Sequence, residues 1–550
     1  MSLERKNQVK SPRAAWGPVA ACLALLLISA CSSGSANKAA EGNVTVGSIQ
    51  AWTGFNSFVP DQGSSIGIAL SNVIHPSAFN VQPGQTAALN TDLLESAELV
   101  STAPQTVVYK IKKSAVWSDG TPITVEDFKY LWSHLNGSND KLLVTNAIGY
   151  SQIKSVAADG NDKTVKVVFS SPFGDWKAMF ATLLPAHYMK TRGVDADAWN
   201  RGLVKDAGPS GGAFTVVENR PDQFVRLERN PKWYGTEAKI KALTVRFLSD
   251  DQAVVQALAS GEVDFPFELK ATQALTGQVK AIGDMTSAVV PTTNQYFINT
   301  QFSNSEVGNL PVRQAIATAV DPAALAKTVI GDGSSELLTS NHVFAPSSPN
   351  YTDDRPEGYG SGDIAAAEKI LEDAGYVKNS NGVYAKNGAA LNLTYIVRAE
   401  DELGKQVGVI LQNTLKKVGI AINIKPIASA DWYATAGTGK FDLALGNYPA
   451  TAFPVSFYSS LYPCKGGYNF AKYCNEKVDA LYNKATSELD AKKQAATVHE
   501  IDQQLWADVA NIPVFEAPVI IAHRNTLKGV EEKLPKEWQL FDAKNWSTQK

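Results

Sequence analysis

Apolar and polar residues alternate along much of the chain with the two-residue period of a half-buried β-strand. In residues 107–112, Tyr109 and Ile111 alternate with Lys110 and Lys112. An Asp-Gly pair and a Pro follow this run closely, which indicates a turn. Similar short apolar runs predict further strands at residues 44–49, 165–169, 214–217, 224–227, 243–247, 391–397 and 420–424.

Other segments place apolar residues three or four positions apart, which is the spacing of one helix face. Residues 363–374 show this stripe, with Asp363 placed to cap the first turn and Gly375 placed to end the helix. Thr124 and Asp127 form an acidic variant of a capping box ahead of another stripe. Helices are therefore predicted at residues 124–135, 251–259, 310–319, 363–374 and 404–418. Because helices and strands interleave, the predicted fold class is α/β.

The first 31 residues have the pattern of a bacterial export signal. Basic residues precede an apolar run at positions 19–28, which is much shorter than the roughly 20 residues that cross a bilayer. The sequence Ile28-Ser29-Ala30-Cys31 resembles the lipobox of bacterial lipoproteins, in which the cysteine is acylated. We expect a signal peptide at residues 1–30, a lipid anchor on Cys31 and a flexible tether at residues 31–41, with ordinary secretion as the alternative.

The length and the net charge of the chain exclude a single small domain and a nucleic-acid-binding protein. A chain of 550 residues is too long for one small domain, and 44% hydrophobic with 19% charged residues supports folded cores. The net charge is −3, and the chain has no polybasic tract. Because nucleic-acid binding needs a strong positive surface, we expect no nucleic-acid partner.

Few residues have the spacing of a catalytic or metal-binding motif. The six histidines lie far apart and no zinc or calcium motif is present, so neither a metal nor another cofactor is predicted. Residues 208–212 match the G-x-S-x-G pattern of serine hydrolases around Ser210. That pattern needs a helix after the serine, whereas a strand is expected here, so a glycine-rich turn is favoured. No catalytic residue is assigned, and a secreted hydrolase is kept as a remote alternative.

Cys464 and Cys474 lie ten residues apart around a Gly-Gly turn. Outside the cytoplasm, this spacing favours a local disulfide that stiffens an exposed loop, with free thiols or a metal pair as the alternatives.

Aromatic and amide residues recur in the connecting segments. Flat apolar rings supply contact area and amides fix orientation, which is the combination that lines a binding cleft. Packing within loops or the core is the alternative for each residue taken singly. The cleft candidates are Trp52, Phe55, Asn56, Asn294, Tyr296, Asn447, Tyr448, Phe453, Tyr468 and Asn469.

Five sequence blocks in the same order resemble a known family, the extracytoplasmic solute-binding proteins of ATP-binding-cassette importers (family 5, the oligopeptide, dipeptide and nickel-binding type). The most diagnostic block contains Trp117-Ser118-Asp119-Gly120-Thr121-Pro122. The order of the opening segments is similar to an actinobacterial lipoprotein subgroup. The resemblance covers nearly all of the chain after the tether, with blocks at residues 109–128, 211–234, 257–264, 312–321 and 371–376.

The resemblance implies a periplasmic-binding-protein-like (type II) fold, in which two hinged lobes close around a solute. The implied divisions are lobe I, an extra domain inserted into lobe I, and lobe II. Lobe I would comprise residues 42–90, 207–300 and 505–550, the inserted domain residues 91–206, and lobe II residues 301–504.

One position departs from the family pattern. Peptide-binding members have an Asp that pairs with the α-ammonium of the peptide, and the alignment places Ala450 there. A buried ammonium without a carboxylate would cost several kcal/mol. Either another acid such as Asp442 substitutes, or the solute is not an ordinary peptide.

The function that the resemblance implies is a lipid-anchored receptor, not an enzyme, that delivers a solute to the permease subunits of an importer. A peptide is the expected solute, and we expect the protein to act as a monomer. The alternatives are a non-peptide solute such as a glycan, a glycolipid or a siderophore-like compound, and a role in envelope assembly.

Overall fold

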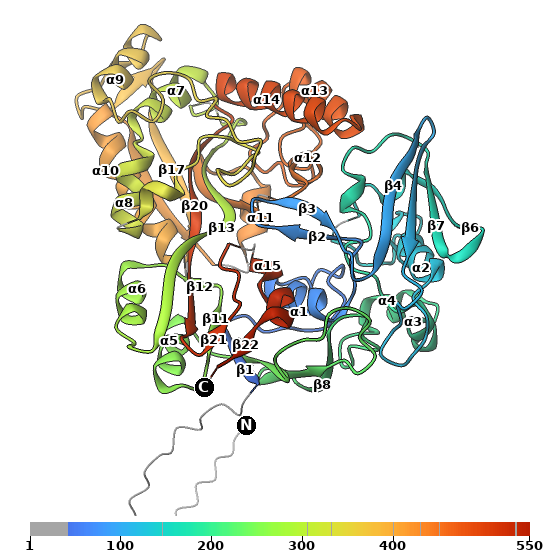
Figure 1. The fold of residues 1–550 in the computed structure, drawn as a ribbon. Coiled ribbons are helices and arrows are strands. Elements are labelled where there is room, and N and C mark those ends of the chain that lie inside the picture. Colours follow the sequence, from blue (N-terminus) through green and yellow to red (C-terminus); the bar gives the residue numbers. More distant parts are fainter. Residues whose placement is uncertain are drawn as a thin grey trace, which may run out of the picture.

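The fold is built around two large sheets, one with five strands and one with six (Figure 1). The computed structural model describes residues 42–549 apart from residues 146, 305, 332, 400, 429–430, 450 and 534–535. The expected signal peptide, the tether and Cys31 lie outside the described residues. Helices and strands interleave along the chain, so the predicted α/β class is confirmed.

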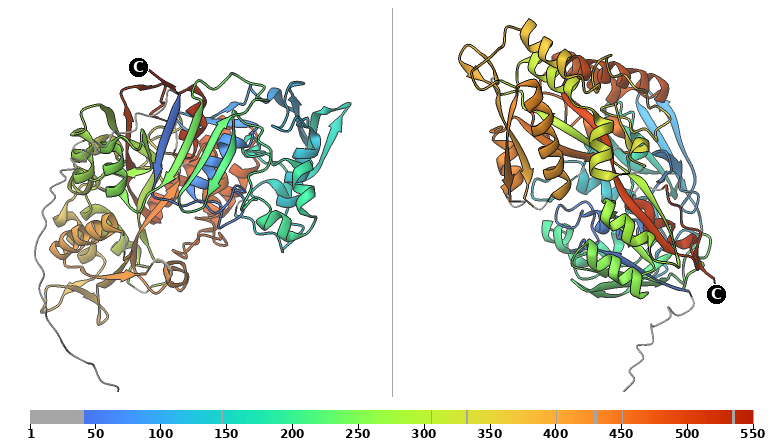
Figure 2. Two further views of the ribbon diagram at one scale, coloured as in Figure 1. Left: turned by 90° about the horizontal axis from the view of Figure 1, so that it is seen from below. Right: turned by 90° about the vertical axis from the view of Figure 1, so that its left-hand side faces the viewer.

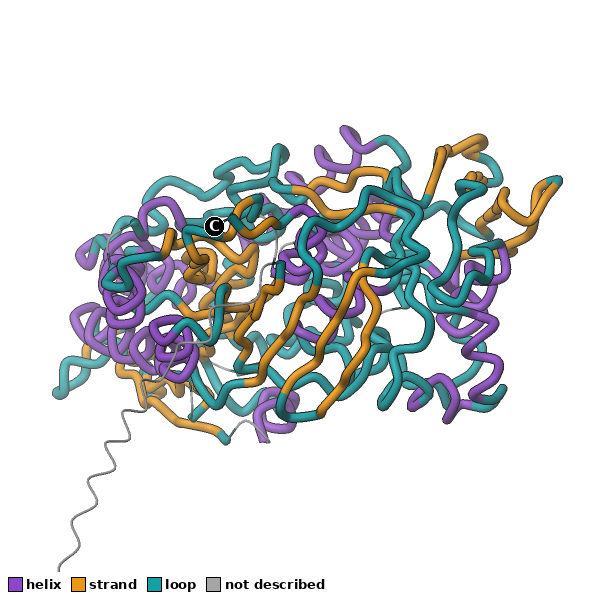
Figure 3. Tube along the Cα trace, turned by 60° about the horizontal axis from the view of Figure 1, so that its bottom comes forward, coloured by secondary structure: helices purple, strands orange, loops and turns teal. Residues whose placement is uncertain are grey.

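The five-stranded sheet packs around the first strand of the chain. Val44 and Val46 of this strand are buried with Ile66 and Leu70 of helix α1 (Ser65–Ile74). The first strand runs parallel to both of its neighbours, and the last three strands of the sheet are antiparallel. Figures 2 and 3 show the strands side by side. In spatial order they are β11 (Phe265–Phe267), β1 (Asn43–Ser48), β10 (Ala242–Phe247), β9 (Phe224–Arg229) and β8 (Phe214–Arg220).

A four-stranded antiparallel sheet contains the strand predicted from the alternation of residues 107–112. Val107, Tyr109 and Ile111 are buried there, whereas Lys110 is exposed. Helices cover this sheet, and the first of them begins with the predicted capping box of Thr124. In spatial order the strands are β4 (Leu94–Thr102), β5 (Gln105–Ile111), β7 (Asn161–Phe169) and β6 (Ile153–Asp159), accompanied by helices α2 (Val125–Leu135), α3 (Ala186–Arg192) and α4 (Ala196–Arg201).

The six-stranded sheet organises the second half of the chain. Its strands, in spatial order, are β12 (Leu269–Lys270), β20 (Asn511–Arg524), β13 (Met285–Thr300), β19 (Leu443–Pro449), β17 (Asn392–Arg398) and β18 (Ala421–Ile427). One core lies between this sheet and helices α7 (Leu310–Ala319), α8 (Pro322–Ile330), α9 (Ile364–Asp373) and α10 (Glu402–Val418). Another core lies among helices α12 (Pro454–Tyr458), α13 (Glu476–Ser487) and α14 (Ala491–Asp508).

Strands β13 and β20 connect the core of the five-stranded sheet with the core of the six-stranded sheet. They pair antiparallel from Met285 to Asn299, and Figure 1 shows them running from the lower part of the molecule into the upper part. Phe515 of β20 belongs to the core of the six-stranded sheet, whereas Val519 and Ile521 belong to the core of the five-stranded sheet. The two cores therefore share a single pair of strands.

The predicted helix at residues 363–374 shows how local signals set its ends. Asp363 caps α9 by accepting a hydrogen bond from the backbone N–H of Ala366 (2.9 Å). Gly375 follows the helix with a φ of 83°, a conformation that side chains disfavour.

The remaining elements are short or connect the sheets. They are β2 (Phe79–Gln82), β3 (Thr86–Leu89), α5 (Asp251–Ser260), α6 (Gln273–Lys280), β14 (Val377–Lys378), β15 (Tyr384–Lys386), β16 (Ala389–Ala390), α11 (Trp432–Gly437), β21 (Leu527–Lys528), α15 (Lys536–Gln539) and β22 (Ser547–Thr548). Within the described ranges, no helix combines the length and apolar character needed to span a membrane.

Candidate functional site

Two neighbouring strands bring together four of the predicted cleft residues. Asn294 and Tyr296 lie on β13, and Asn447 and Tyr448 lie on the antiparallel strand β19. Tyr296 pairs with Asn447 in register, and the Tyr448 hydroxyl accepts a hydrogen bond from Asn299 Nδ2 (2.8 Å). The four residues of this β13–β19 group lie on adjacent strands, but Tyr448 pairs with Gln295 and therefore faces the opposite side of the sheet from Tyr296 and Asn447.

The next three candidates lie after β19. Phe453 is half-buried immediately before α12. Tyr468 is 46% exposed, and its ring centroid lies 6.4 Å from that of Phe470. Asn469 is buried, and its Nδ2 donates to the backbone carbonyls of Pro463 and Tyr473. Its amide is therefore engaged within its own loop.

The same loop contains the predicted cysteine pair. Cys464 and Cys474 are joined by a disulfide, and the backbone N–H of Cys464 donates to Asp479 Oδ1 (2.9 Å) at the start of α13. The disulfide and the Asn469 amide together fix this loop beside α13.

Trp52, Phe55 and Asn56 lie elsewhere. All three are buried, and both aromatic residues belong to the core of the five-stranded sheet. Trp52 Nε1 donates to Asn219 Oδ1 (2.9 Å), and Asn56 Nδ2 donates to the backbone carbonyl of Trp199 (3.0 Å). The structure therefore engages these side chains in packing and does not bring them into the β13–β19 group.

Ala450 stands where peptide-binding members of the family have an Asp, and Asp442 was suggested as its substitute. Ala450 lies outside the described residues. Asp442, the suggested substitute, accepts hydrogen bonds from the backbone N–H of Thr394 (2.7 Å) and from Asn304 Nδ2 (2.9 Å). Its carboxylate is thus engaged at the edge of β19.

Ser210 is part of a buried turn. Its hydroxyl lies 2.9 Å from the carbonyl oxygen of Ile74 and 2.6 Å from that of Phe214, and it accepts from Gly212 N–H (3.0 Å). The following residues form strand β8, as the sequence predicts, in place of the helix of a hydrolase elbow. Among the described residues, no group of three His, Cys, Asp or Glu side chains could hold a metal.

Glu516 is a buried acid at the strands shared by both cores, and the sequence analysis did not identify it. On β20 it pairs in register with Gln295 of β13, which pairs in turn with Tyr448 of β19. Cross-strand partners lie on the same face of a sheet, so these three residues form a row across three strands. Burial raises the pKa of Glu516 to about 8.

Tyr458 of α12 faces this row. Its side chain is completely buried, and burial raises the pKa of its hydroxyl, which the neighbouring Tyr448 and Glu516 raise further. Neither Glu516 Oε1 nor the Tyr458 hydroxyl has a hydrogen-bond partner among the described residues. An unsatisfied buried polar atom costs about 1–3 kcal/mol.

Asp175 joins the region predicted as the inserted domain to the region predicted as lobe II. Its carboxylate is buried and accepts from the backbone N–H (2.9 Å) and the hydroxyl of Ser456, on α12. Gln494 Nε2 of α14 donates to the other carboxylate oxygen (3.0 Å). Burial raises the pKa of Asp175, and these hydrogen bonds oppose the rise.

Two neighbouring contacts reinforce this junction. The backbone N–H of Gly174 donates to the carbonyl of Thr486 (2.7 Å). A Cβ at Gly174 would lie 2.2 Å from the carbonyl oxygen of Glu488, so this close approach requires glycine. In the β2–β3 turn, Gln85 Nε2 donates to Ser347 Oγ (2.9 Å). The predicted lobes therefore meet at these contacts as well as along β13 and β20.

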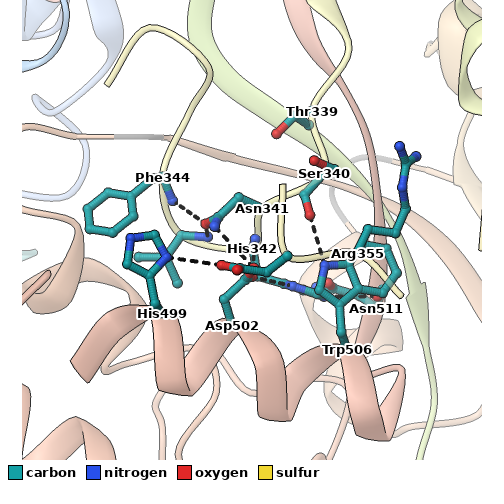
Figure 4. Close-up of polar contacts among 12 residues, drawn as sticks. Thr339, Ser340, Asn341, His342, Phe344, Arg355, His499, Asp502, Trp506 and Asn511 are labelled. Carbon is teal, nitrogen blue, oxygen red and sulfur yellow. Dashed lines mark hydrogen bonds and ion pairs between the residues drawn. The ribbon is translucent and has the colours of Figure 1, made fainter. Parts of the chain in front are cut away.

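The Thr339 hydroxyl lies 3.3 Å from the side-chain amide of Gln295. The segment that begins with Thr339 is held by the buried polar cluster shown in Figure 4. His342 Nδ1 lies 2.7 Å from Asp502 Oδ1, and His342 Nε2 lies 3.1 Å from the carbonyl oxygen of Asn511. The two ring nitrogens therefore fix the imidazole between Asp502 of α14 and Asn511 of β20. Asn341 Nδ2 donates to the second carboxylate oxygen (3.0 Å). The cluster holds residues 339–344 against α14.

One of these missed residues had a signal in the sequence. Glu516 is the single charged residue in the otherwise apolar run from Ile512 to Ile521. An acid inside a buried strand is rarely tolerated without a partner or a role. Asp175 had no comparable local signal, because its partners lie 281 and 319 residues further along the chain.

The architecture defines the class of protein. Two parts that share a pair of strands and meet again through Asp175 have the arrangement of a two-lobed binding protein, and solved structures share this type II fold. One is titled the periplasmic EDTA-binding protein EppA, with a TM-score of 0.87, 28% identity and coverage of 93% of this chain and 97% of that chain. The oligopeptide-binding protein AppA of Bacillus subtilis, solved with a nonapeptide, has a TM-score of 0.75 at 21% identity over 92% and 99% of the two chains.

The chain belongs to family 5 of the bacterial extracellular solute-binding proteins, whose model matches residues 88–469. Among its relatives, the oligopeptide-binding protein OppA of Mycobacterium tuberculosis is 28% identical over 480 residues, which cover 86% of this chain and 79% of the relative. The probable monoacyl phosphatidylinositol tetramannoside-binding protein LpqW of the same species is 26% identical over 445 residues, or 75% and 68%. The family resemblance seen in the sequence is confirmed.

The Asp175 junction makes a testable prediction. Replacing Asp175 with Ala removes three hydrogen bonds between the two regions and should weaken the contact between them by about 2 kcal/mol. We expect small-angle X-ray scattering to give a larger radius of gyration for Asp175→Ala than for the wild type. Asp159→Ala, an exposed acid of the same sheet region, is the control and should not change the radius. Equal radii for Asp175→Ala and the wild type would contradict the junction.

Glu516 predicts a pH dependence of stability. Its folded-state pKa of about 8 lies above its ordinary value of about 4.3, so between these values the folded chain retains a proton that the unfolded chain releases. The free energy of unfolding should therefore fall as pH rises from 5.5 to 7.5, by at most about 1.4 kcal/mol per pH unit from this group.

Urea unfolding at the two pH values checks this slope. Glu516→Gln should remove the part of the slope that Glu516 contributes, and Glu98→Gln, at an exposed position of β4, should leave the wild-type slope unchanged. A Glu516→Gln slope equal to that of the wild type would contradict the assignment.

Proposed function

We propose that this protein is a lipid-anchored receptor of an ABC importer, which binds a peptide between two hinged lobes and delivers it unaltered to the membrane permease. The observation that carries the proposal is the shared pair of strands, β13 and β20, together with the hydrogen bonds of Asp175 to Ser456 between the two regions. Cys31 is the proposed anchor, and residues 31–41 are the proposed tether.

Several relatives support a peptide as the solute. OppA of Mycobacterium tuberculosis and AppA of Bacillus subtilis are both named oligopeptide-binding proteins, and DppE of Bacillus subtilis is named a dipeptide-binding protein. In the proposed division, lobe I (residues 42–90, 207–300 and 505–550) carries the inserted domain of residues 91–206 and faces lobe II (residues 301–504).

The proposed mechanism follows from the strands shared by the lobes. Small changes of twist along β13 and β20 would move the lobes apart, and the Asp175 contacts would form on closure. Solute affinity is then the interaction with both lobes less the free energy needed to close them. Of the β13–β19 residues Asn294, Tyr296, Asn447 and Tyr448, the proposed solute contact is Tyr448, which lies on the face of Gln295 and Glu516. Tyr296 and Asn447 lie on the opposite face, toward Phe515.

A non-peptide solute is the second candidate, favoured by three observations. The structure with a TM-score of 0.87 is titled an EDTA-binding protein, and one relative is named as binding a mannosylated phosphatidylinositol. Asp442, which could have replaced the missing amine anchor, is already bound to Thr394 and Asn304. An enzymatic role has less support, because the Ser210 hydroxyl is engaged by the backbone atoms of Ile74 and Gly212.

A peptide library tests the proposed function. Saturating binding of a peptide to the folded chain should raise the melting temperature by a few degrees, since a ligand at a hundred times its Kd adds about 2.7 kcal/mol to the free energy of unfolding. We expect a pool of di- to pentapeptides to produce this shift in differential scanning fluorimetry and to change the tryptophan fluorescence. No response to any peptide in the pool would contradict a peptide solute.

A further inference from the structure

We propose that Glu516 and Tyr458 form a subsite for a cationic nitrogen of the solute, in which the Glu516 carboxylate pairs with a primary ammonium or a guanidinium group. The inference rests on the proposed function in one respect, namely that a solute enters between the lobes. Beyond the proposed function, the inference specifies that the solute carries a positive charge where it contacts Glu516.

The first argument is the unsatisfied state of the carboxyl group. Glu516 is 1% exposed, its Oε1 has no hydrogen-bond partner, and no ion pair joins it to any described residue. By contrast Gln295, beside it in the row, lies 3.3 Å from the Thr339 hydroxyl. A native protein rarely buries a polar atom unpaired unless a ligand or a function uses it.

The second argument is the position of Glu516 along β20. Phe515 packs into the core of the six-stranded sheet and Val519 into the core of the five-stranded sheet, so Glu516 lies where the strand passes from one region to the other. Consecutive side chains of a strand point to opposite faces, which directs Glu516 away from the core that holds Phe515. A second unpartnered group, the Tyr458 hydroxyl, faces it from the short helix that also carries Ser456.

The buried carboxyl of Glu516 also determines which charge a solute can present to it. Burial is the cause of the raised pKa of Glu516, and no neighbouring cation opposes it. The titratable groups that face it are Tyr458 and Tyr448, which are neutral at ordinary pH. A cationic nitrogen would restore the ionised carboxylate and gain a charge-assisted hydrogen bond. An anionic or a neutral solute would leave the carboxyl protonated, because neither stabilises the ionised carboxylate.

This chemistry has a thermodynamic consequence. At pH 6.5 the carboxyl of Glu516 is protonated in the free protein, because this pH lies below its pKa of about 8. Pairing with a cation requires the ionised form, so binding should release up to one proton per solute molecule. Isothermal titration calorimetry in two buffers of different ionisation enthalpy measures that release directly.

The experiment compares the wild type, Glu516→Gln and the exposed-site control Glu98→Gln. The cationic probes are the pool of di- to pentapeptides, arginine and putrescine, and the anionic probe is EDTA. We expect at least one cationic probe to bind the wild type and the control with proton release. Glu516→Gln should bind that probe about tenfold to a hundredfold more weakly, with no proton release. Blocking the amine by acetylation should abolish the difference between the wild type and Glu516→Gln.

The outcomes separate the inference from the proposed function. If peptides bind the wild type and Glu516→Gln equally and without proton release, the subsite is wrong and the peptide receptor stands. If arginine or putrescine binds through Glu516 while no peptide binds, the subsite stands and the peptide solute is wrong. If no cationic probe binds, or if EDTA binds in their place, the cationic subsite is overturned.

Discussion

The structure depends on one pair of strands that two hydrophobic cores share. Both cores bury residues of β20, and the hydrogen-bonded ladder between β13 and β20 continues from one core into the other. A ladder of backbone hydrogen bonds resists stretching and sliding but permits twist, so it can hold two bodies together and still allow them to move. Two buried polar residues, Gln295 of β13 and Glu516 of β20, pair with each other in this ladder.

The buried acids of this region differ in how many hydrogen-bond partners they have, and this difference separates structural acids from a candidate ligand contact. The carboxylate of Asp175 has three hydrogen-bond donors from α12 and α14, and the carboxylate of Asp502 is bonded by His342 and Asn341. Asp175 and Asp502 both stabilise contacts between segments that lie far apart in the sequence. Glu516 is as buried as either of them but lacks such partners. Satisfied acids hold the structure together, whereas an unsatisfied acid is available to a ligand.

Local patterns predicted those parts of the fold that local physics determines. The alternation around Tyr109, the capping box of Thr124 and the cap of Asp363 each act over a few residues, and the structure contains all three. The family blocks predicted the type II fold, which the solved structures confirm. The candidate site was predicted less well, because partners such as Asp175 and Ser456 meet only through tertiary folding. The aromatic pattern alone could not separate Tyr448, beside the shared strands, from Phe55, which is packed in a core.

The central claim is that the two parts of the chain hold a solute between them beside β13 and β20. A crystal structure of the protein purified with its solute from the native host tests this claim most directly. The account predicts a chemically unaltered solute that contacts both parts of the chain and lies against Tyr448, Tyr458 and Glu516. A solute bound to one part alone, far from the shared strands, would contradict the account.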